Sequence, residues 1–198
     1  MEWSEGIAIH RVHSAKYGAA EFNPGTKGDA RFSPITNSAT GKAIPTLYGG
    51  NTFTCAIMET AFHDVPFVAG PKTFNKLRLT EQVHSKLVPV TALVLADLRN
   101  LALRKLGVTR GLLIDSDPTD YPITRKWAEA IYSQAPTLQG LCWTSRQDDS
   151  STAVMLFGDR IDPGALKVAN LPLSLLKDID TYRKLQAIAD RIGVFLVG

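Results

Sequence analysis

Three side chains in the N-terminal part of the sequence could act on one substrate: Arg31, Tyr48 and Glu59. An arginine can donate two hydrogen bonds to a phosphate, and a tyrosine offers a flat face to an aromatic ring. A carboxylate can stabilise a cationic, sugar-like transition state or orient a hydroxyl nucleophile. Together the three suit a substrate with phosphates, an aromatic base and a ribose between them, and a nicotinamide dinucleotide is such a substrate.

Each of these residues alone also has an ordinary structural explanation, as a surface charge, a half-buried packing residue or a solvated helix carboxylate. Two further candidates are Arg11, which could place a second guanidinium beside Arg31, and Ser145, at a strand end where a rigid element aims a side chain into a cleft. An outward strand position for Arg11 and local backbone hydrogen bonding for Ser145 are the competing explanations.

The local pattern predicts which elements carry the two arginines and the tyrosine. Apolar and polar residues alternate over Ile7 to Val12, which is typical of a strand and would carry Arg11. Arg31 to Ser33 is predicted to be a short extended piece. Leu47-Tyr48 begins another strand, after which Gly49-Gly50 permits a sharp turn.

The carboxylate and the serine are expected on different elements. Thr52 to His63 is predicted to be a helix that carries Glu59, with Asn51 or Thr52 capping its first turn. Ser145 ends a strand and precedes a polar turn.

The rest of the chain mixes strands and helices without strict alternation. We expect strand-like pieces at Phe74 to Leu79, on both sides of Pro89 within Lys86 to Leu98, at Gly140 to Ser145, at Ala153 to Phe157 and at Val194 to Val197. We expect helices at Leu98 to Leu106, from Pro122 to about Gln134 and at Thr181 to Ile192. This order predicts an α+β fold, with a mixed or antiparallel sheet flanked by helices in one domain over residues 1–198.

Composition narrows the functional classes. The 198 residues are 44% hydrophobic and 21% charged, as in an ordinary globular domain. The net charge of +3 favours an anionic ligand, but without a basic block it predicts no direct nucleic-acid binding. No apolar run reaches the roughly 18 residues of a membrane span, and the acidic start does not resemble a secretory signal. Cys55 and Cys142 fit reduced thiols, so we expect a cytoplasmic protein without membrane contact.

Several signatures of other chemistry are missing. The histidines show no metal-ligand spacing and the cysteines no CxxC neighbour, so we expect no metal site. A serine or cysteine hydrolase lacks its motif. The sequence has neither GxGxxG nor GxxxxGK[ST], so a dinucleotide would not be held in the Rossmann or P-loop manner.

The order of these features resembles the RES-domain family, named for its arginine, glutamate and serine. The matching segments are Ile9-His10-Arg11-Val12, Gly28-Asp29-Ala30-Arg31-Phe32-Ser33-Pro34, Pro45-Thr46-Leu47-Tyr48, Thr54-Cys55-Ala56-Ile57-Met58-Glu59-Thr60, Trp143-Thr144-Ser145-Arg146 and Ala153-Val154-Met155-Leu156-Phe157. Glu59 follows Tyr48 by eleven residues, which is similar to the family's usual interval. The motif-bearing core spans about residues 7–158, and a C-terminal helix and strand fall in 159–198.

The resemblance implies a fold related to ADP-ribosyltransferase toxins and a role as the toxin of a bacterial type II toxin–antitoxin pair. Such proteins consume NAD by hydrolysis or phosphorolysis of the nicotinamide–ribose bond. NAD is then a substrate and no cofactor is implied, with inorganic phosphate a candidate co-substrate. The implied partner is an antitoxin with a helix-turn-helix DNA-binding domain whose tail blocks the pocket. A homodimer within that complex is compatible with the resemblance.

With this resemblance, our hypothesis gives each candidate a role. Glu59 stabilises the oxocarbenium-like ribose or orients the nucleophile. Arg31 and Arg11 bind the phosphates, Tyr48 packs against the nicotinamide or its ribose, and Ser145 holds a ribose hydroxyl or a phosphate oxygen. Nicotinamide is cationic at its ring nitrogen, so it can leave without a general acid and one carboxylate suffices.

Two alternatives to NAD depletion stay open at this point. One is a protein ADP-ribosyltransferase with a dedicated target. The other is an inactive module that binds a nucleotide or the antitoxin. Hydrolysis, phosphorolysis and protein modification share the first bond-breaking step, and the sequence does not choose between them.

Overall fold

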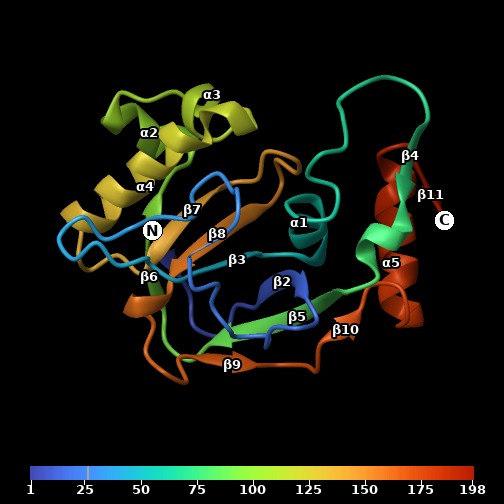
Figure 1. Ribbon diagram of the computed structural model, residues 1–198, viewed down its shortest axis with the longest axis horizontal. Helices are drawn as coiled ribbons and strands as arrows, with labels where there is room; N and C mark the ends of the chain where they lie inside the picture. The colour runs from blue at the N-terminus through green and yellow to red at the C-terminus, as the bar shows by residue number, and fades with distance from the viewer. Residues whose placement is uncertain (26) are drawn as a thin grey trace.

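The computed structural model describes residues 1–25 and 27–198 (Figure 1). Its main sheet is built from β1 (Glu2–Trp3), β2 (Ile9–Ser14), β3 (Thr46–Gly50), β5 (Gln82–Pro89), β6 (Leu93–Asp97), β7 (Gly140–Thr144), β8 (Thr152–Phe157), β9 (Leu166–Val168) and β10 (Leu173–Ser174). The strand order is β1-β6-β7-β8-β3-β2-β5-β10, and β9 also pairs with β5. Within the described chain the pairings of this sheet are antiparallel apart from the parallel pair of β6 and β7.

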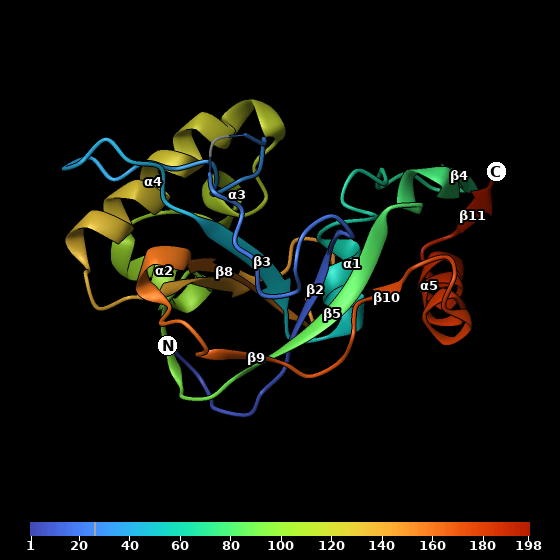
Figure 2. The same cartoon turned by 60° about the horizontal axis from the view of Figure 1, so that its bottom comes forward.

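Four of the five α-helices in the described residues lie towards two ends of this sheet, and α1 (Phe53–Met58) packs against its central strands β2, β3 and β8. The other four are α2 (Asn100–Leu106), α3 (Arg110–Leu113), α4 (Tyr121–Gln134) and α5 (Ile179–Arg191), with short 3₁₀ helices η1 (Lys76–Leu79), η2 (Pro118–Asp120) and η3 (Gly158–Arg160). In both views α2, α3 and α4 gather at one end (Figures 1 and 2). At the other end α5 lies beside a small parallel sheet of β4 (Lys72–Asn75) and β11 (Val194–Val197). Across the described residues, none of these helices has the length and apolar character that a membrane crossing requires.

The central strands are buried on both faces of the sheet. Along β8, Met155 and Phe157 pack with Ala128 and Tyr132 of α4, whereas Leu156 between them faces a second cluster formed with β6 and β1. Side chains alternate across a strand, so an apolar residue at every position indicates cover on both sides. A third cluster joins α1 to α5 and β4. The predicted α+β class is thus confirmed.

Gly49 and Gly50 serve close packing rather than the sharp turn that their sequence predicts. Both continue β3 and pair with β8. A Cβ atom added at Gly49 would come within 2.5 Å of the Ile9 side chain, and one at Gly50 within 2.4 Å of the Cys55 sulfur. Glycine is therefore needed here because β2 and α1 approach the β3 backbone too closely for a side chain.

The helix predicted from Thr52 to His63 is shorter than expected. Thr52 caps its first turn, as predicted, but α1 ends at Met58. Beyond that residue three successive backbone amides converge on the carbonyl oxygen of Ile57, and the Phe62 ring is fully buried. Glu59 consequently stands at the C-terminal end of α1 instead of in the middle of a longer helix.

The strand predicted from Phe74 to Leu79 is wrong from Lys76 onward. β4 ends at Asn75, whose side-chain oxygen accepts a hydrogen bond from the Leu77 amide at 2.9 Å. This side-chain contact offers the backbone an alternative to the strand ladder. The chain therefore turns into η1, which the alternation of the sequence did not indicate.

Candidate active site

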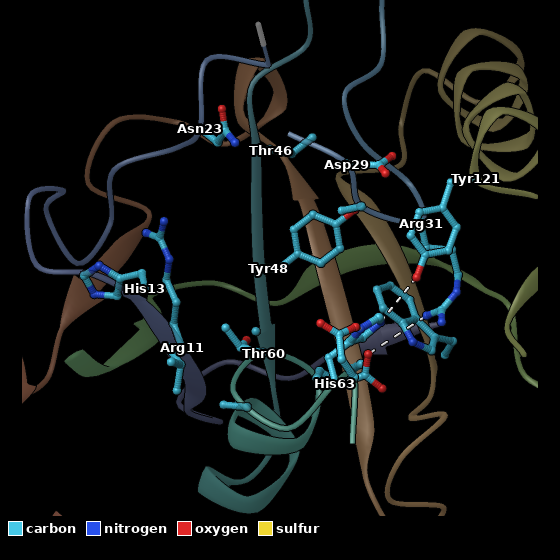
Figure 3. Close-up of a pocket in the computed structure, with 18 residues that line it drawn as sticks. Arg11, His13, Asn23, Asp29, Arg31, Thr46, Tyr48, Thr60, His63 and Tyr121 are labelled. Atoms are coloured by element: carbon cyan, nitrogen blue, oxygen red, sulfur yellow. Dashed lines mark hydrogen bonds and ion pairs between the residues drawn. The ribbon is translucent and has the colours of Figure 1, made fainter. Parts of the chain in front are cut away.

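A pocket of about 360 Å³ opens between β2, β3, the end of α1 and the start of α4 (Figure 3). Its volume falls in the range of about 300–1,000 Å³ that small-molecule sites occupy. Four of the five predicted site residues line it: Arg11, Arg31, Tyr48 and Glu59. The fifth, Ser145, lies behind the pocket wall and contacts Glu59.

The Glu59 carboxylate is held from outside the pocket by residues that follow β7. Its Oε1 accepts hydrogen bonds from the Ser145 hydroxyl at 2.6 Å and from the Arg146 backbone N–H at 3.0 Å. Its Oε2 lies 4.0 Å from Arg31 Nη1. One carboxylate oxygen is thus fixed by two donors while the other faces the pocket, an arrangement that can stabilise positive charge without reorganisation.

Ser145 acts on this carboxylate in the structure. The residue is fully buried, and its hydroxyl oxygen accepts the backbone amides of Gln147 and Asp148, each at 3.1 Å. The Arg110 guanidinium donates to the Ser145 carbonyl at 3.1 Å and so fixes the end of β7. The contact of Ser145 with a ribose hydroxyl or a phosphate oxygen stays a prediction. In the structure the Ser145 hydroxyl donates to Glu59.

Arg31 lies in a tight turn rather than in the extended piece that its sequence predicts. The backbones of Ala30 and Ser33 pair with each other in both directions, at 2.9 and 3.4 Å. From α4, Thr124 donates its hydroxyl to the Arg31 carbonyl, and Arg125 Nε donates to the Ala30 carbonyl at 3.1 Å. Hydrogen bonds within the turn and from α4 therefore hold the backbone at Arg31 in place.

The guanidinium of Arg31 is buried, and two of its nitrogens have no hydrogen-bond partner among the described residues. Arg31 is 4% exposed, and these two nitrogens are Nε and Nη2. The Tyr121 ring covers it, with 5.7 Å between the guanidinium carbon and the ring centroid. Buried donors are nearly always satisfied, so two unpaired ones at a pocket favour an anionic ligand as the missing partner.

Tyr48 forms the middle of the pocket wall. Its hydroxyl accepts the Phe32 backbone N–H at 3.2 Å, and its ring meets Trp143 edge to face at 6.3 Å. Burial raises the pKa of Tyr48 to about 12, so the phenol is neutral at physiological pH. A neutral, fixed ring is suited to packing against an aromatic base, and that contact remains a prediction.

Arg11 lies across the pocket from Arg31, on the other side of Tyr48, and not beside it (Figure 3). Its Nη1 donates to the backbone carbonyls of Ala19 at 2.7 Å, Glu21 at 2.8 Å and Gly18 at 3.4 Å. Burial lowers the pKa of Arg11 to about 10, which leaves the group charged at neutral pH. Arg11 therefore ties down the loop that follows β2, and its predicted phosphate contact stays a prediction.

Comparison with known proteins places the chain in a family. The model of the RES domain matches residues 8–176. This chain belongs to the RES-domain family. Arg31, Glu59 and Ser145, the residues that the sequence resemblance assigns to the family's arginine, glutamate and serine, lie next to one another in the structure.

A solved structure is similar to this RES domain over nearly its whole length. It is the crystal structure of the M. tuberculosis MbcT–MbcA toxin–antitoxin complex, matched with a TM-score of 0.65 and 17% sequence identity. The match covers 94% of this chain and 91% of that chain. At this identity the likeness shows a shared fold. No curated protein matches the chain.

Two residues of this RES domain site were not predicted from the sequence. Tyr121 and His63 both line the pocket, and the Tyr121 hydroxyl lies 3.3 Å from His63 Nε2. A signal for His63 existed, since it follows Glu59 by four residues and would share its helix face. Among the described residues no three histidine, cysteine, aspartate or glutamate side chains gather into a metal site.

Proposed function

We propose that this chain is the toxin of a bacterial type II toxin–antitoxin pair and that it depletes NAD by breaking the nicotinamide–ribose bond. The observation that carries the proposal is the Glu59 carboxylate. It is fixed on one side by Ser145 and the Arg146 amide and faces the buried guanidinium of Arg31 on the other.

The proposed bond cleavage follows from these charges. As the carbon–nitrogen bond of NAD lengthens, its electron pair moves to the pyridinium nitrogen and nicotinamide departs neutral. Positive charge then develops on the ribose, where the free oxygen of Glu59 stabilises it. Because the carboxylate is already oriented by Ser145, it need not reorganise during the reaction.

The remaining residues position the dinucleotide. The unpaired Nε and Nη2 of Arg31 supply two donors for the diphosphate. The neutral ring of Tyr48 packs against the nicotinamide or its ribose. Arg11 lies at the opposite side of the pocket, where it adds positive charge for the far phosphate.

Family membership supports the biological part of the proposal, and the structural neighbour is a toxin bound to an antitoxin. We extend this to a cytoplasmic toxin whose partner is an antitoxin with a helix-turn-helix domain. In this proposal the tail of the antitoxin fills the pocket and blocks access to Glu59. A homodimer within the complex is part of the same proposal.

The experiment is to incubate the protein with NAD, with and without inorganic phosphate, and to identify products by mass spectrometry. Glu59→Gln keeps the shape and removes the charge, so NAD loss is expected to fall by at least about 100-fold. Glu5→Gln, at an exposed position, is the matched control and is expected to keep the wild-type rate. NAD loss at the wild-type rate in Glu59→Gln would contradict the assignment.

The same incubation separates the alternatives. ADP-ribose or ADP-ribose-1″-phosphate supports depletion, by hydrolysis or by phosphorolysis. An ADP-ribosyl adduct on a protein, with NAD loss that accelerates when the target is added, indicates a transferase. A bound dinucleotide without product over hours indicates a binding module.

A further inference from the structure

Three pocket residues form a hydrogen-bonded chain that the proposed bond cleavage does not use. The Tyr121 hydroxyl lies 3.3 Å from His63 Nε2, and His63 Nδ1 lies 2.9 Å from the Asp64 carboxylate. All three residues line the same pocket as Glu59. The His63 backbone is itself held by the Gln147 side chain, which donates to its carbonyl at 2.9 Å.

The Asp64 carboxylate sets the direction in which protons move along these hydrogen bonds. A carboxylate can only accept, so Asp64 requires the proton on His63 Nδ1. His63 Nε2 is then the acceptor for the Tyr121 O–H. The Tyr121 oxygen keeps its lone pairs for a donor in the pocket, and the chain leads protons from the pocket to His63.

Tyr121 lines the same pocket as Glu59 and Arg31. It is 2% exposed, its ring lies over Arg31, and its hydroxyl points inward toward His63 (Figure 3). The charged groups around it are Arg31, Arg146, Asp64 and Glu59, and burial raises the pKa of Tyr121 above its ordinary value. Tyr121 is therefore a neutral hydroxyl that can pass a proton on without itself carrying charge.

We propose that Tyr121, His63 and Asp64 take up the proton of a water molecule that attacks the ribosyl cation, which makes this site a hydrolase. The inference rests on the proposed function. The water oxygen forms a bond to the anomeric carbon and gives one proton to the Tyr121 oxygen, while the Tyr121 proton moves to His63 Nε2. The products are ADP-ribose and a His63 imidazolium paired with Asp64.

The relay can be reset from solvent. The His63 side chain is 26% exposed, so its imidazolium can release the proton after each turnover. Asp64 lies at the rim and also pairs with Arg78 at 3.9 Å. Tyr121 is the catalytic residue in this scheme, and His63 and Asp64 act through it.

The proposal distinguishes water from phosphate. Water must lose a proton as it attacks, whereas inorganic phosphate at pH 8 already carries an ionised oxygen and needs no proton acceptor. A broken relay therefore slows hydrolysis selectively, while a merely structural role of these residues would slow both reactions alike.

The test uses Tyr121→Phe, which keeps the ring over Arg31, and His63→Gln. ADP-ribose formation is measured in phosphate-free buffer, and ADP-ribose-1″-phosphate formation with phosphate added. Loss of a proton acceptor predicts hydrolysis slower by about 100-fold, with phosphorolysis within about threefold of wild type. Tyr17→Phe, at an exposed tyrosine, is the matched control.

Three results would overturn the relay. Equal losses of hydrolysis and phosphorolysis in both variants would indicate a structural role. Wild-type protein that consumes NAD only with phosphate would exclude water as the nucleophile. Wild-type hydrolysis in His63→Gln, beside an inactive Glu59→Gln, would refute the relay and leave the proposed function standing. No NAD consumption by the wild type under either condition would refute the proposed function itself.

Discussion

Arg11 and Arg31 lie on opposite sides of one pocket and are buried alike, at 7% and 4% exposure. Their guanidinium groups nevertheless have opposite surroundings. Arg11 shares one nitrogen among three backbone carbonyls, whereas Arg31 has two buried nitrogens without a partner in the described chain and a carboxylate 4.0 Å away. The fold thus uses the Arg11 donors to hold a loop, and it leaves two Arg31 donors unpaired at a cost in stability. The proposed function gives those two donors to a ligand.

The largest expected effect comes from Arg31→Met, which keeps length and removes the donors. Loss of two charge-assisted hydrogen bonds, about 3 kcal/mol together, predicts a rise in KM for NAD of roughly 100-fold. Thermal unfolding is expected to show unchanged or higher stability, because unpaired buried donors disappear. An unaltered KM would count against the phosphate role.

The same substitution at Arg11, on the other side of the pocket, tests the difference between the two arginines. Arg11→Met leaves three carbonyls without their donor and is expected to lower the free energy of unfolding by about 2 kcal/mol. Urea unfolding measures this loss. The folded protein is expected to retain most of its affinity for NAD. A KM increase as large as that of Arg31→Met would show that Arg11 binds the phosphates as directly as Arg31 does, which would contradict the contrast.

A smaller effect is expected at Ser145, which serves the Arg31 side of the pocket through Glu59. Ser145→Ala removes one of two hydrogen bonds to the carboxylate, so kcat is expected to fall by about tenfold with KM little changed. Ser38→Ala, at an exposed serine, is the control. A large increase in KM with unchanged kcat would instead favour direct contact of Ser145 with the substrate.

The predicted elements agree best where the pattern is strong and local. The strands at β7 and β8 and the helices at α2, α4 and α5 were predicted within a few residues, and Gly107 ends α2 in the left-handed conformation, as expected for a helix stop. The errors have particular causes. The predicted strand beyond Asn75 is a 3₁₀ helix, because the Asn75 side chain caps that helix. The turn predicted at Gly49 is absent, because this glycine lets the β3 backbone pack closely against Ile9. The strands β1, β9 and β10 are too short to show the alternation of apolar and polar residues that predicts a strand.

The sequence by itself determined which side chains bear chemistry and in what order they occur, because residue type and near spacing are local properties. It also determined the family, through short motifs whose resemblance agrees with the family match over residues 8–176. Only the tertiary structure decided what each group faces. Ser145 meets Glu59 across 86 residues, and Thr124 meets the Arg31 turn across 93. Hydrogen-bond partners from such distant segments decide whether an arginine is used by the fold or left for a ligand, and no local pattern contains that information.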